Sequence, residues 1–147
     1  GLNESQATYN FTTSYVVPTD EFGVTFVAPP SGNVEFRIEN MFIDLGSGGA
    51  GDIYVGISTA NATSGYSALQ SYHEKNIIDN EGRFAESVTS LSWTLVGLTA
   101  GTSYTYYVGF KTISTTGTPH FQWGGSASDR TPELIIKAIA LPATIST

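Results

Sequence analysis

Two histidines, His73 and His120, are the first residues whose chemistry could serve catalysis or metal binding. They lie far apart in the sequence, and a zinc site needs three or four converging ligands. The chain contains no cysteine, which excludes disulfide bonds, cysteine zinc sites and thiol catalysis. We therefore expect no histidine-based site, and His73 next to Glu74 is more simply a solvated pair.

The serine and glycine residues do not form a known catalytic motif. Ser47 lies in the tract GSGGAG at residues 46–51, but no serine lies in the Gly-x-Ser-x-Gly turn that places a nucleophile between a strand and a helix. The tract also lacks the Lys-Ser/Thr of a phosphate-binding loop. We expect it to be a mobile turn.

Acidic residues offer two further kinds of site. A glycosidase needs two carboxylates across a cleft, whereas Asp79 and Glu81 share one loop and are expected to face water. Calcium takes oxygen ligands from loops, so a site built from Asp44, Asp52 or residues 79–81 is an alternative, although none has the EF-hand spacing. We expect no catalytic residue, no metal and no cofactor.

Charge and hydropathy exclude two classes of partner. Six Lys and Arg against thirteen Asp and Glu give a net charge of −7, so nucleic acid is not expected, because phosphate binding needs clustered cations. No apolar run approaches the roughly 18–20 residues of a membrane span. Charged residues make up 13% of the chain, against about 25% in an average soluble domain. Such a polar, uncharged surface is typical of extracellular sandwiches and virus particles.

Short runs of β-branched and aromatic residues, separated by Gly, Pro, Asn and Ser, indicate an all-β chain. The expected strands are residues 7–13, 22–28, 34–45, 53–58, 86–95, 104–113, 120–123 and 133–141. About eight short strands with regular turns predict an antiparallel β-sandwich, jelly-roll-like, in a single domain of residues 1–147. Residues 1–6 and 143–147 are expected to be flexible or contact-making tails.

Two segments are less regular. Residues 86–95 contain four apolar core candidates, and their phase slips near Ser90, which indicates a β-bulge; the candidates are Val88, Leu91, Trp93 and Leu95. Residues 59–80 leave two alternatives open, a short helical turn near residues 68–74 or an irregular insertion.

Aromatic residues are the remaining candidates for binding. Tyr66, Tyr72 and Trp123 lie beside loops and are candidates for a platform that stacks against sugar rings. The alternative, which we favour, is that Trp123 caps the core. Along the strand 104–113 successive side chains alternate between faces, so Tyr106 and Tyr107 point to opposite sides, and one of them needs a partner or an exposed position.

Three segments together resemble a known family. FGVTFVAPPSGNVEFRI at residues 22–38 resembles the opening of small β-sandwich modules in bacteriophage structural proteins. VGLTAGTSYTYYV at residues 96–108 and PELIIKAIALP at residues 132–142 resemble a later strand and the closing strand of these modules. The second segment also resembles fibronectin type III domains, with Leu98 and Tyr104 at the matching positions, but this chain is longer and has an additional strand after it.

The resemblance implies a role as well as a fold. The modules occur in tail fibres, minor tail proteins and capsid appendages, and some are expected to be trimeric jelly rolls similar to the tumour-necrosis-factor fold. It implies a non-enzymatic protein of the virion surface, a capsid decoration, head-fibre or tail-fibre subunit, that contacts copies of itself and other virion proteins. Candidate interface residues are Tyr104, Tyr106, Tyr107 and Phe121. The alternatives are a module that binds carbohydrate or a host receptor glycan, and a fibronectin-like spacer.

Overall fold

The computed structural model describes residues 7–46, 52–61, 74–78, 86–124 and 131–143, and antiparallel strands make up most of these residues. One three-residue 3-10 helix, η1, precedes the second strand. In chain order the elements are β1 (Ala7–Asn10), η1 (Asp20–Phe22), β2 (Gly23–Val27), β3 (Val34–Asp44), β4 (Ile53–Ser58), β5 (Glu74–Ile78), β6 (Glu86–Leu95), β7 (Ser103–Thr112), β8 (His120–Trp123) and β9 (Ile135–Ala140). Within the described ranges, no helix has the length and apolar character needed to cross a membrane.

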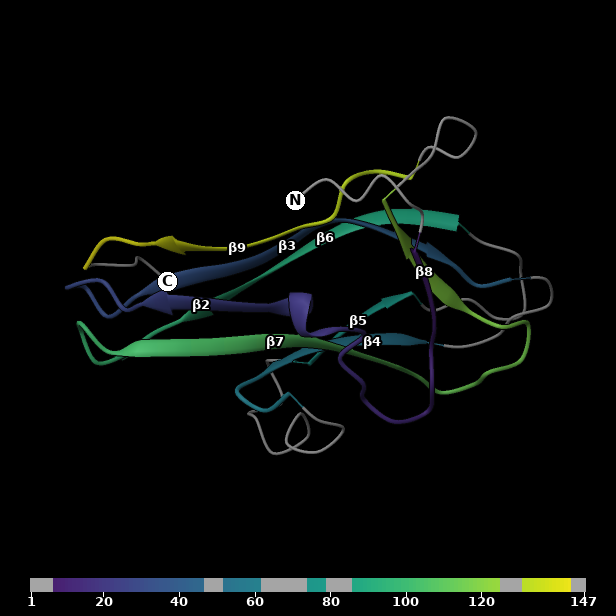
Figure 1. The fold of residues 1–147 in the computed structure, drawn as a ribbon, viewed down its shortest axis with the longest axis horizontal. Helices are drawn as coiled ribbons and strands as arrows, with labels where there is room; N and C mark the ends of the chain where they lie inside the picture. The colour runs from purple at the N-terminus through teal and green to yellow at the C-terminus, as the bar shows by residue number, and fades with distance from the viewer. Residues whose placement is uncertain (1–6, 47–51, 62–73, 79–85, 125–130, 144–147) are drawn as a thin grey trace.

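The strands form two sheets that pack face to face (Figure 1). One sheet has the order β1-β8-β3-β6, with β9 also paired to β3, and the other has the order β2-β7-β4-β5. The pairs β1·β8, β2·β7, β3·β6 and β4·β5 are all antiparallel. These are the pairs formed when one long hairpin ribbon is rolled up, with the first strand meeting the eighth. This is the strand order of a jelly roll, which confirms the predicted fold class and differs from the order of fibronectin-like sandwiches.

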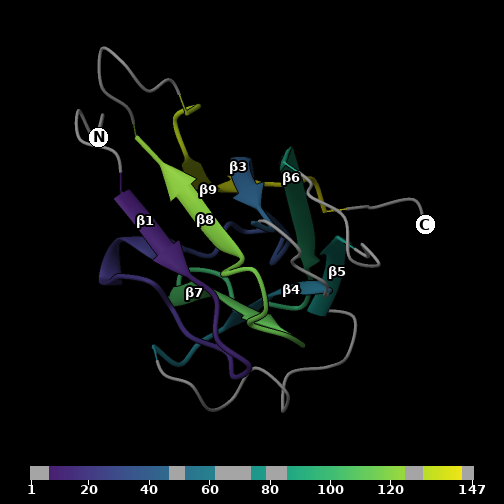
Figure 2. The same cartoon turned by 90° about the vertical axis from the view of Figure 1, so that its right-hand side faces the viewer.

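The ninth strand arises because β3 is long enough to pair twice along one edge. Residues 34–39 of β3 pair with β9, whereas residues 42–44 pair with β8. Figure 2 shows β8 lying between β1 and the far end of β3. The closing stretch of the chain therefore covers one edge of β3 as two consecutive strands.

Aromatic rings from both sheets form the centre of the core. Phe121 of β8 and Phe110 of β7 stack with ring centroids 5.3 Å apart, and both are fully buried. Phe22 meets both rings edge-on, at 5.9 Å and 5.7 Å. Edge-to-face and offset-stacked pairs are the favourable geometries for aromatic rings, so this cluster joins the two sheets where η1 closes over them.

A β-bulge in β3 allows both halves of this strand to face the core. Between the pairs Ile38↔Leu91 and Met41↔Thr89, β3 has one more residue than β6. Asn40, in this bulge, has φ 62°, a left-handed conformation that Asn tolerates better than most residues. Side chains along a strand alternate between its two faces. Before the bulge the buried residues of β3 have even numbers, and after it they have odd numbers, with Met41 and Ile43 both fully buried.

Two predictions need correction. The bulge predicted near Ser90 of β6 lies instead on the neighbouring strand, because β3 carries the extra residue at this level. β6 therefore alternates regularly between the two faces. Val88, which was predicted to be in the core, points outward and is 54% exposed. The segment left open as a helical turn or irregular insertion contains β5, which pairs with β4. Residues 62–73 and 79–80 of that segment lie outside the described residues.

The end of β3 approaches the turn between β7 and β8 so closely that only glycine fits. Gly46 has φ +69°, and a Cβ added there would lie 2.8 Å from the carbonyl carbon of Gly117 and closer still to its oxygen. Gly97 has a similar φ of +72°, but a Cβ added there would meet no described atom within 4 Å.

We expect Gly46→Ala to lower the free energy of unfolding by more than about 3 kcal/mol, because a backbone clash adds to the strain of positive φ. Gly97→Ala is the matched control and is expected to cost only about 1–2 kcal/mol, since it adds that strain alone. Urea unfolding of both variants measures the difference. Equal losses would contradict the close approach at Gly46.

Candidate functional site

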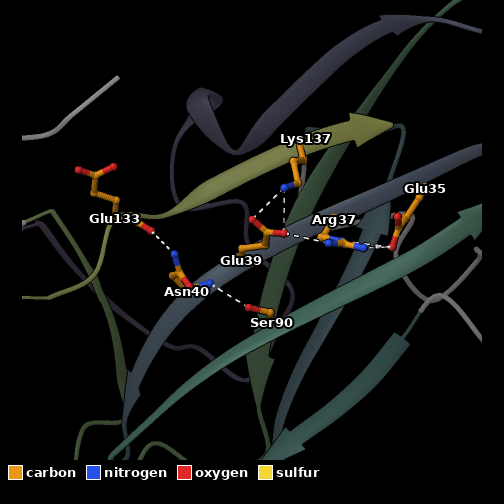
Figure 3. Close-up of polar contacts among 7 residues, drawn as sticks. All are labelled: Glu35, Arg37, Glu39, Asn40, Ser90, Glu133 and Lys137. Atoms are coloured by element: carbon orange, nitrogen blue, oxygen red, sulfur yellow. Dashed lines mark hydrogen bonds and ion pairs between the residues drawn. The ribbon is translucent and has the colours of Figure 1, made fainter. Parts of the chain in front are cut away.

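The outer face of the five-stranded sheet carries a cluster of paired charges. Alternation along β3 puts Glu35, Arg37 and Glu39 on the same face, away from the buried Val34, Phe36 and Ile38. Lys137 of β9 lies opposite Arg37 in the register, which brings a fourth charge to this face. We call these four residues the ion network (Figure 3).

The four charges of the ion network neutralise one another. The Nη2 and Nε atoms of Arg37 donate to Glu35 Oε1 at 2.6 Å and 3.1 Å, and its Nη1 donates to Glu39 Oε1 at 3.1 Å. Lys137 Nζ lies 2.9 Å and 3.0 Å from the two carboxylate oxygens of Glu39. Two carboxylates thus balance two cations, although the whole chain is strongly acidic.

The ion network shifts the pKa values of Glu39 and Arg37. Hydrogen bonds from Lys137 and then from Arg37 hold the pKa of Glu39 below its ordinary value. Hydrogen bonds to Glu35 and Glu39 raise the pKa of Arg37 above its ordinary value. Both shifts favour the charged forms of Glu39 and Arg37. Because these side chains are partly open to water, the pairs contribute more to local order than to stability.

The β-bulge fixes the position of the ion network relative to β6 and β9. The backbone N–H of Asn40 donates to Ser90 Oγ at 3.1 Å, and Asn40 Nδ2 donates to the carbonyl oxygen of Glu133 at 3.2 Å (Figure 3). A shallow hollow of about 190 Å³ lies beside this contact, and it is lined by Arg37, Glu39, Ser90, Leu91 and Ser92.

Exposed apolar side chains surround the charged cluster. Ile135 and Ile139 of β9 are 40% and 36% exposed, and Val88 of β6 is 54% exposed. By the alternation of their strands, all three point outward from the same sheet. Charges paired with one another, together with exposed aliphatic groups, suit a contact with another protein surface better than they suit catalysis, because no nucleophile with an adjacent base is among them.

A second cluster lies on the outer side of the four-stranded sheet. Lys111 Nζ sits 4.7 Å and 4.8 Å from the ring centroids of Tyr15 and Tyr54, which is within cation–π range. The Tyr54 hydroxyl donates to Asp52 Oδ2 at 2.9 Å. Sequence reasoning missed this cluster, because its members come from separate segments and no local pattern links them.

The residues considered for metal binding have other contacts. Asp44 Oδ1 accepts a hydrogen bond from the Gly46 N–H at 2.6 Å, and its Oδ2 lies 3.6 Å from His120 Nε2. In the described part of the chain, no three His, Asp or Glu side chains come together in a way that could hold a metal ion. His73, Ser47 and residues 79–81 lie outside the described residues.

The four predicted interface residues have different surroundings. Phe121 is fully buried, so its prediction as an interface residue is wrong, because it stacks on Phe110 between the two sheets. Tyr106 packs against the core and contacts Phe26 and Phe36. The partly buried Tyr104 accepts a hydrogen bond from the Thr99 N–H at 3.1 Å through its hydroxyl oxygen.

Tyr107 is the member of the Tyr106–Tyr107 pair that points outward. It lies opposite Gly23 in the register, and a Cβ added to Gly23 would come within 2.6 Å of its ring. The ring therefore covers the glycine on the outer side of the four-stranded sheet. This agrees with the prediction that the two tyrosines point to opposite faces, and Tyr107 remains a predicted interface residue.

Trp123, the described member of the predicted sugar platform, packs on the core. Its ring lies 5.2 Å from Phe121 in a stacked arrangement and 5.2 Å from Phe22 in an edge-on arrangement. This confirms the favoured interpretation that Trp123 caps the core. Tyr66 and Tyr72 lie outside the described residues, so their part in a platform stays a prediction.

Comparisons with known proteins give no relative. No protein-family description, no curated protein and no solved structure matches this chain.

We expect Glu39→Gln to lower the melting temperature at neutral pH and to have no effect in acid. The pKa of Glu39 is lowered in the folded state, so its stabilising effect is present above the glutamate pKa of about 4.3 and is lost as the pH falls through the folded value. Melting temperatures from pH 2 to pH 7 measure this, and added salt should shrink the neutral-pH difference.

Glu21→Gln is the matched control, because Glu21 is an exposed carboxylate on η1 and the charge change is the same. If both variants show the same pH profile, pairing of Glu39 in the ion network does not stabilise the folded state.

Proposed function

We propose that this chain is a non-enzymatic structural protein of a bacteriophage particle, a capsid decoration, head-fibre or tail-fibre subunit. It works at the virion surface by contacting copies of itself, as a trimer, and other virion proteins. The observation that carries the proposal is the set of strand pairs β1·β8, β2·β7, β3·β6 and β4·β5. They define a jelly roll, a fold used by viral capsid and lectin domains.

A second observation supports the family resemblance on which the proposal rests. The three segments that resemble phage modules, residues 22–38, 96–108 and 132–142, are distant in sequence but adjacent in space. β2 pairs with β7, and β3 pairs with β9. The three similar segments thus form one structural unit at one end of the sandwich, the left end in Figure 1.

Hydrogen bonds between the turns hold this unit together. The N–H groups of Ala28 and Leu98 donate to the carbonyl oxygens of Thr102 and Gly32, at 2.9 Å and 3.0 Å. Ser31 Oγ donates to the carbonyl oxygen of Leu141 at 2.7 Å, and the buried Asn33 donates through Nδ2 to that of Pro142 at 3.0 Å. A resemblance at three separate places is more specific when those places contact one another in the fold.

The surface of the sandwich is consistent with assembly. The outer face of the five-stranded sheet presents the ion network beside Ile135, Ile139 and Val88, which are exposed. Paired charges can enter an interface without leaving an uncompensated charge behind, and exposed aliphatic groups gain from burial. Host glycan binding, the alternative role, loses Trp123 as a free aromatic ring, because that ring packs on Phe121 and Phe22.

Mass spectrometry of purified particles tests the virion assignment. Trypsin should release residues 84–111 as one peptide, because this stretch lies between Arg83 and Lys111 and contains no other Lys or Arg. We expect the peptide in gradient-purified phage particles from the strain that carries the coding sequence, at a constant ratio to the major capsid protein across the particle peak. A peptide found only in soluble fractions would contradict the assignment.

Light scattering coupled to gel filtration tests the proposed trimer. We expect a mass of three times the 15.6 kDa of the chain, because a closed ring of three copies covers the same patch on every copy. A monomer at all concentrations would contradict the trimer without bearing on whether the chain is present in particles.

A further inference from the structure

β6 is the longest open sheet edge in the described part of the chain. It pairs with β3 along one side, and no described strand pairs with its other side. It has ten residues, whereas the other edge strands β1, β2, β5 and β9 have four, five, five and six. An open edge offers a row of unpaired N–H and C=O groups that can accept another strand.

The sequence and geometry of β6 itself lack the features by which a strand blocks edge pairing. Such features are prolines, lysines, bulges and a short strand length. The sequence ESVTSLSWTL has no proline and no lysine, and its single charge, Glu86, is at its first residue. The nearby bulge has its extra residue on β3, so β6 keeps regular alternation. By contrast, β9 carries Lys137, and its Ala138 lines a narrow groove shared with Phe26 of β2.

We infer that β6 pairs edge to edge with β6 of a second copy of this chain, antiparallel and about a two-fold axis near Ser90. The two five-stranded sheets then become one continuous sheet. This inference rests on the proposed self-association and names a contact for it. An isologous contact joins two copies, so it forms either a dimer or a bridge between two trimers.

The side chains of β6 fit this arrangement. Antiparallel pairing centred on Ser90 places Val88 opposite Ser92 and Glu86 opposite Thr94, all on the outer face. In this register no two like charges lie directly opposite each other. Like charges in that position would destabilise the cross-strand pairing. The chain as a whole carries a net charge of −7, so two copies repel one another in general, whereas β6 brings only one charge, Glu86 at its first residue, into the contact.

The size of the contact predicts its strength. Ten residues at about 3.4 Å each give an edge about 34 Å long, and a sheet thickness of about 10 Å gives roughly 340 Å² per copy. Stable interfaces bury about 800 Å² per partner, so the contact alone is weak. On a particle that displays many copies, weak contacts reinforce one another through high effective concentration.

The test is the mass of the full chain by light scattering across a wide concentration range. We expect the mass to double at high concentration, from one copy to two or from three copies to six. Ser90→Lys should abolish the doubling, because two lysines then meet at the two-fold axis. Val88→Lys is a second variant that keeps the hydrogen bond between Asn40 and Ser90, and it should also weaken pairing, since lysine on an edge opposes it.

Thr116→Lys is the matched control, since Thr116 is exposed in the turn between β7 and β8 and the charge change is the same. We expect it to leave the doubling intact. Hydrogen exchange of the unmodified chain gives a measurement that needs no variant. Amides of residues 86–95 should exchange more slowly at high concentration, while those of β2 should not change.

The outcomes separate this inference from the proposed trimer. A change from one copy to two that Ser90→Lys and Val88→Lys remove supports edge pairing and contradicts the trimer, whereas three copies at every concentration support the trimer and overturn edge pairing. A change from three copies to six that Ser90→Lys and Val88→Lys remove supports both the trimer and edge pairing. A doubling that both variants retain, or concentration-independent exchange in β6, overturns the inference.

Discussion

The extra residue at Asn40 is the constraint on which the layout of this sandwich depends. Among the strands that the structure describes, β3 alone pairs with three others, β6 along one edge and β9 and β8 along the other. An unbroken alternation would turn Met41 and Ile43 toward water, because a strand has a strict period of two. The left-handed conformation of Asn40 resets the alternation, so one strand supplies the core along its whole length.

The same bulge connects the core to the outer surface. Asn40 joins β3 to Ser90 on β6 and to the segment that leads into β9 through its hydrogen bonds. The three strands are therefore held in one register where Arg37, Glu39 and Lys137 meet. On the inner side, the ring cluster of Phe22, Phe110 and Phe121 closes the two sheets on each other. The bulge thus sets both the register of the outer face and the entry of Met41 and Ile43 into the core.

The two faces of the five-stranded sheet serve different purposes. The inner face is apolar and fully packed, with Phe36, Ile38 and Phe121 without solvent exposure. The outer face carries balanced charges, hydroxyl groups and scattered aliphatic side chains, and no described strand pairs with the outer edge of β6. The proposed contact with copies of the same chain needs such a surface more than it needs a cleft.

The sequence by itself determined where the strands lie, because alternation and turn residues are local signals. Eight strands were predicted close to their observed bounds, and so was the opposition of Tyr106 and Tyr107. It did not reveal β5 or the burial of Phe121. Tertiary structure alone decided which strands pair, and so brought Glu39 to Lys137, 98 residues away, and Lys111 between Tyr15 and Tyr54. Those contacts depend on how the hairpin ribbon rolls up, and rolling is set by the packing of distant side chains, which no local pattern records.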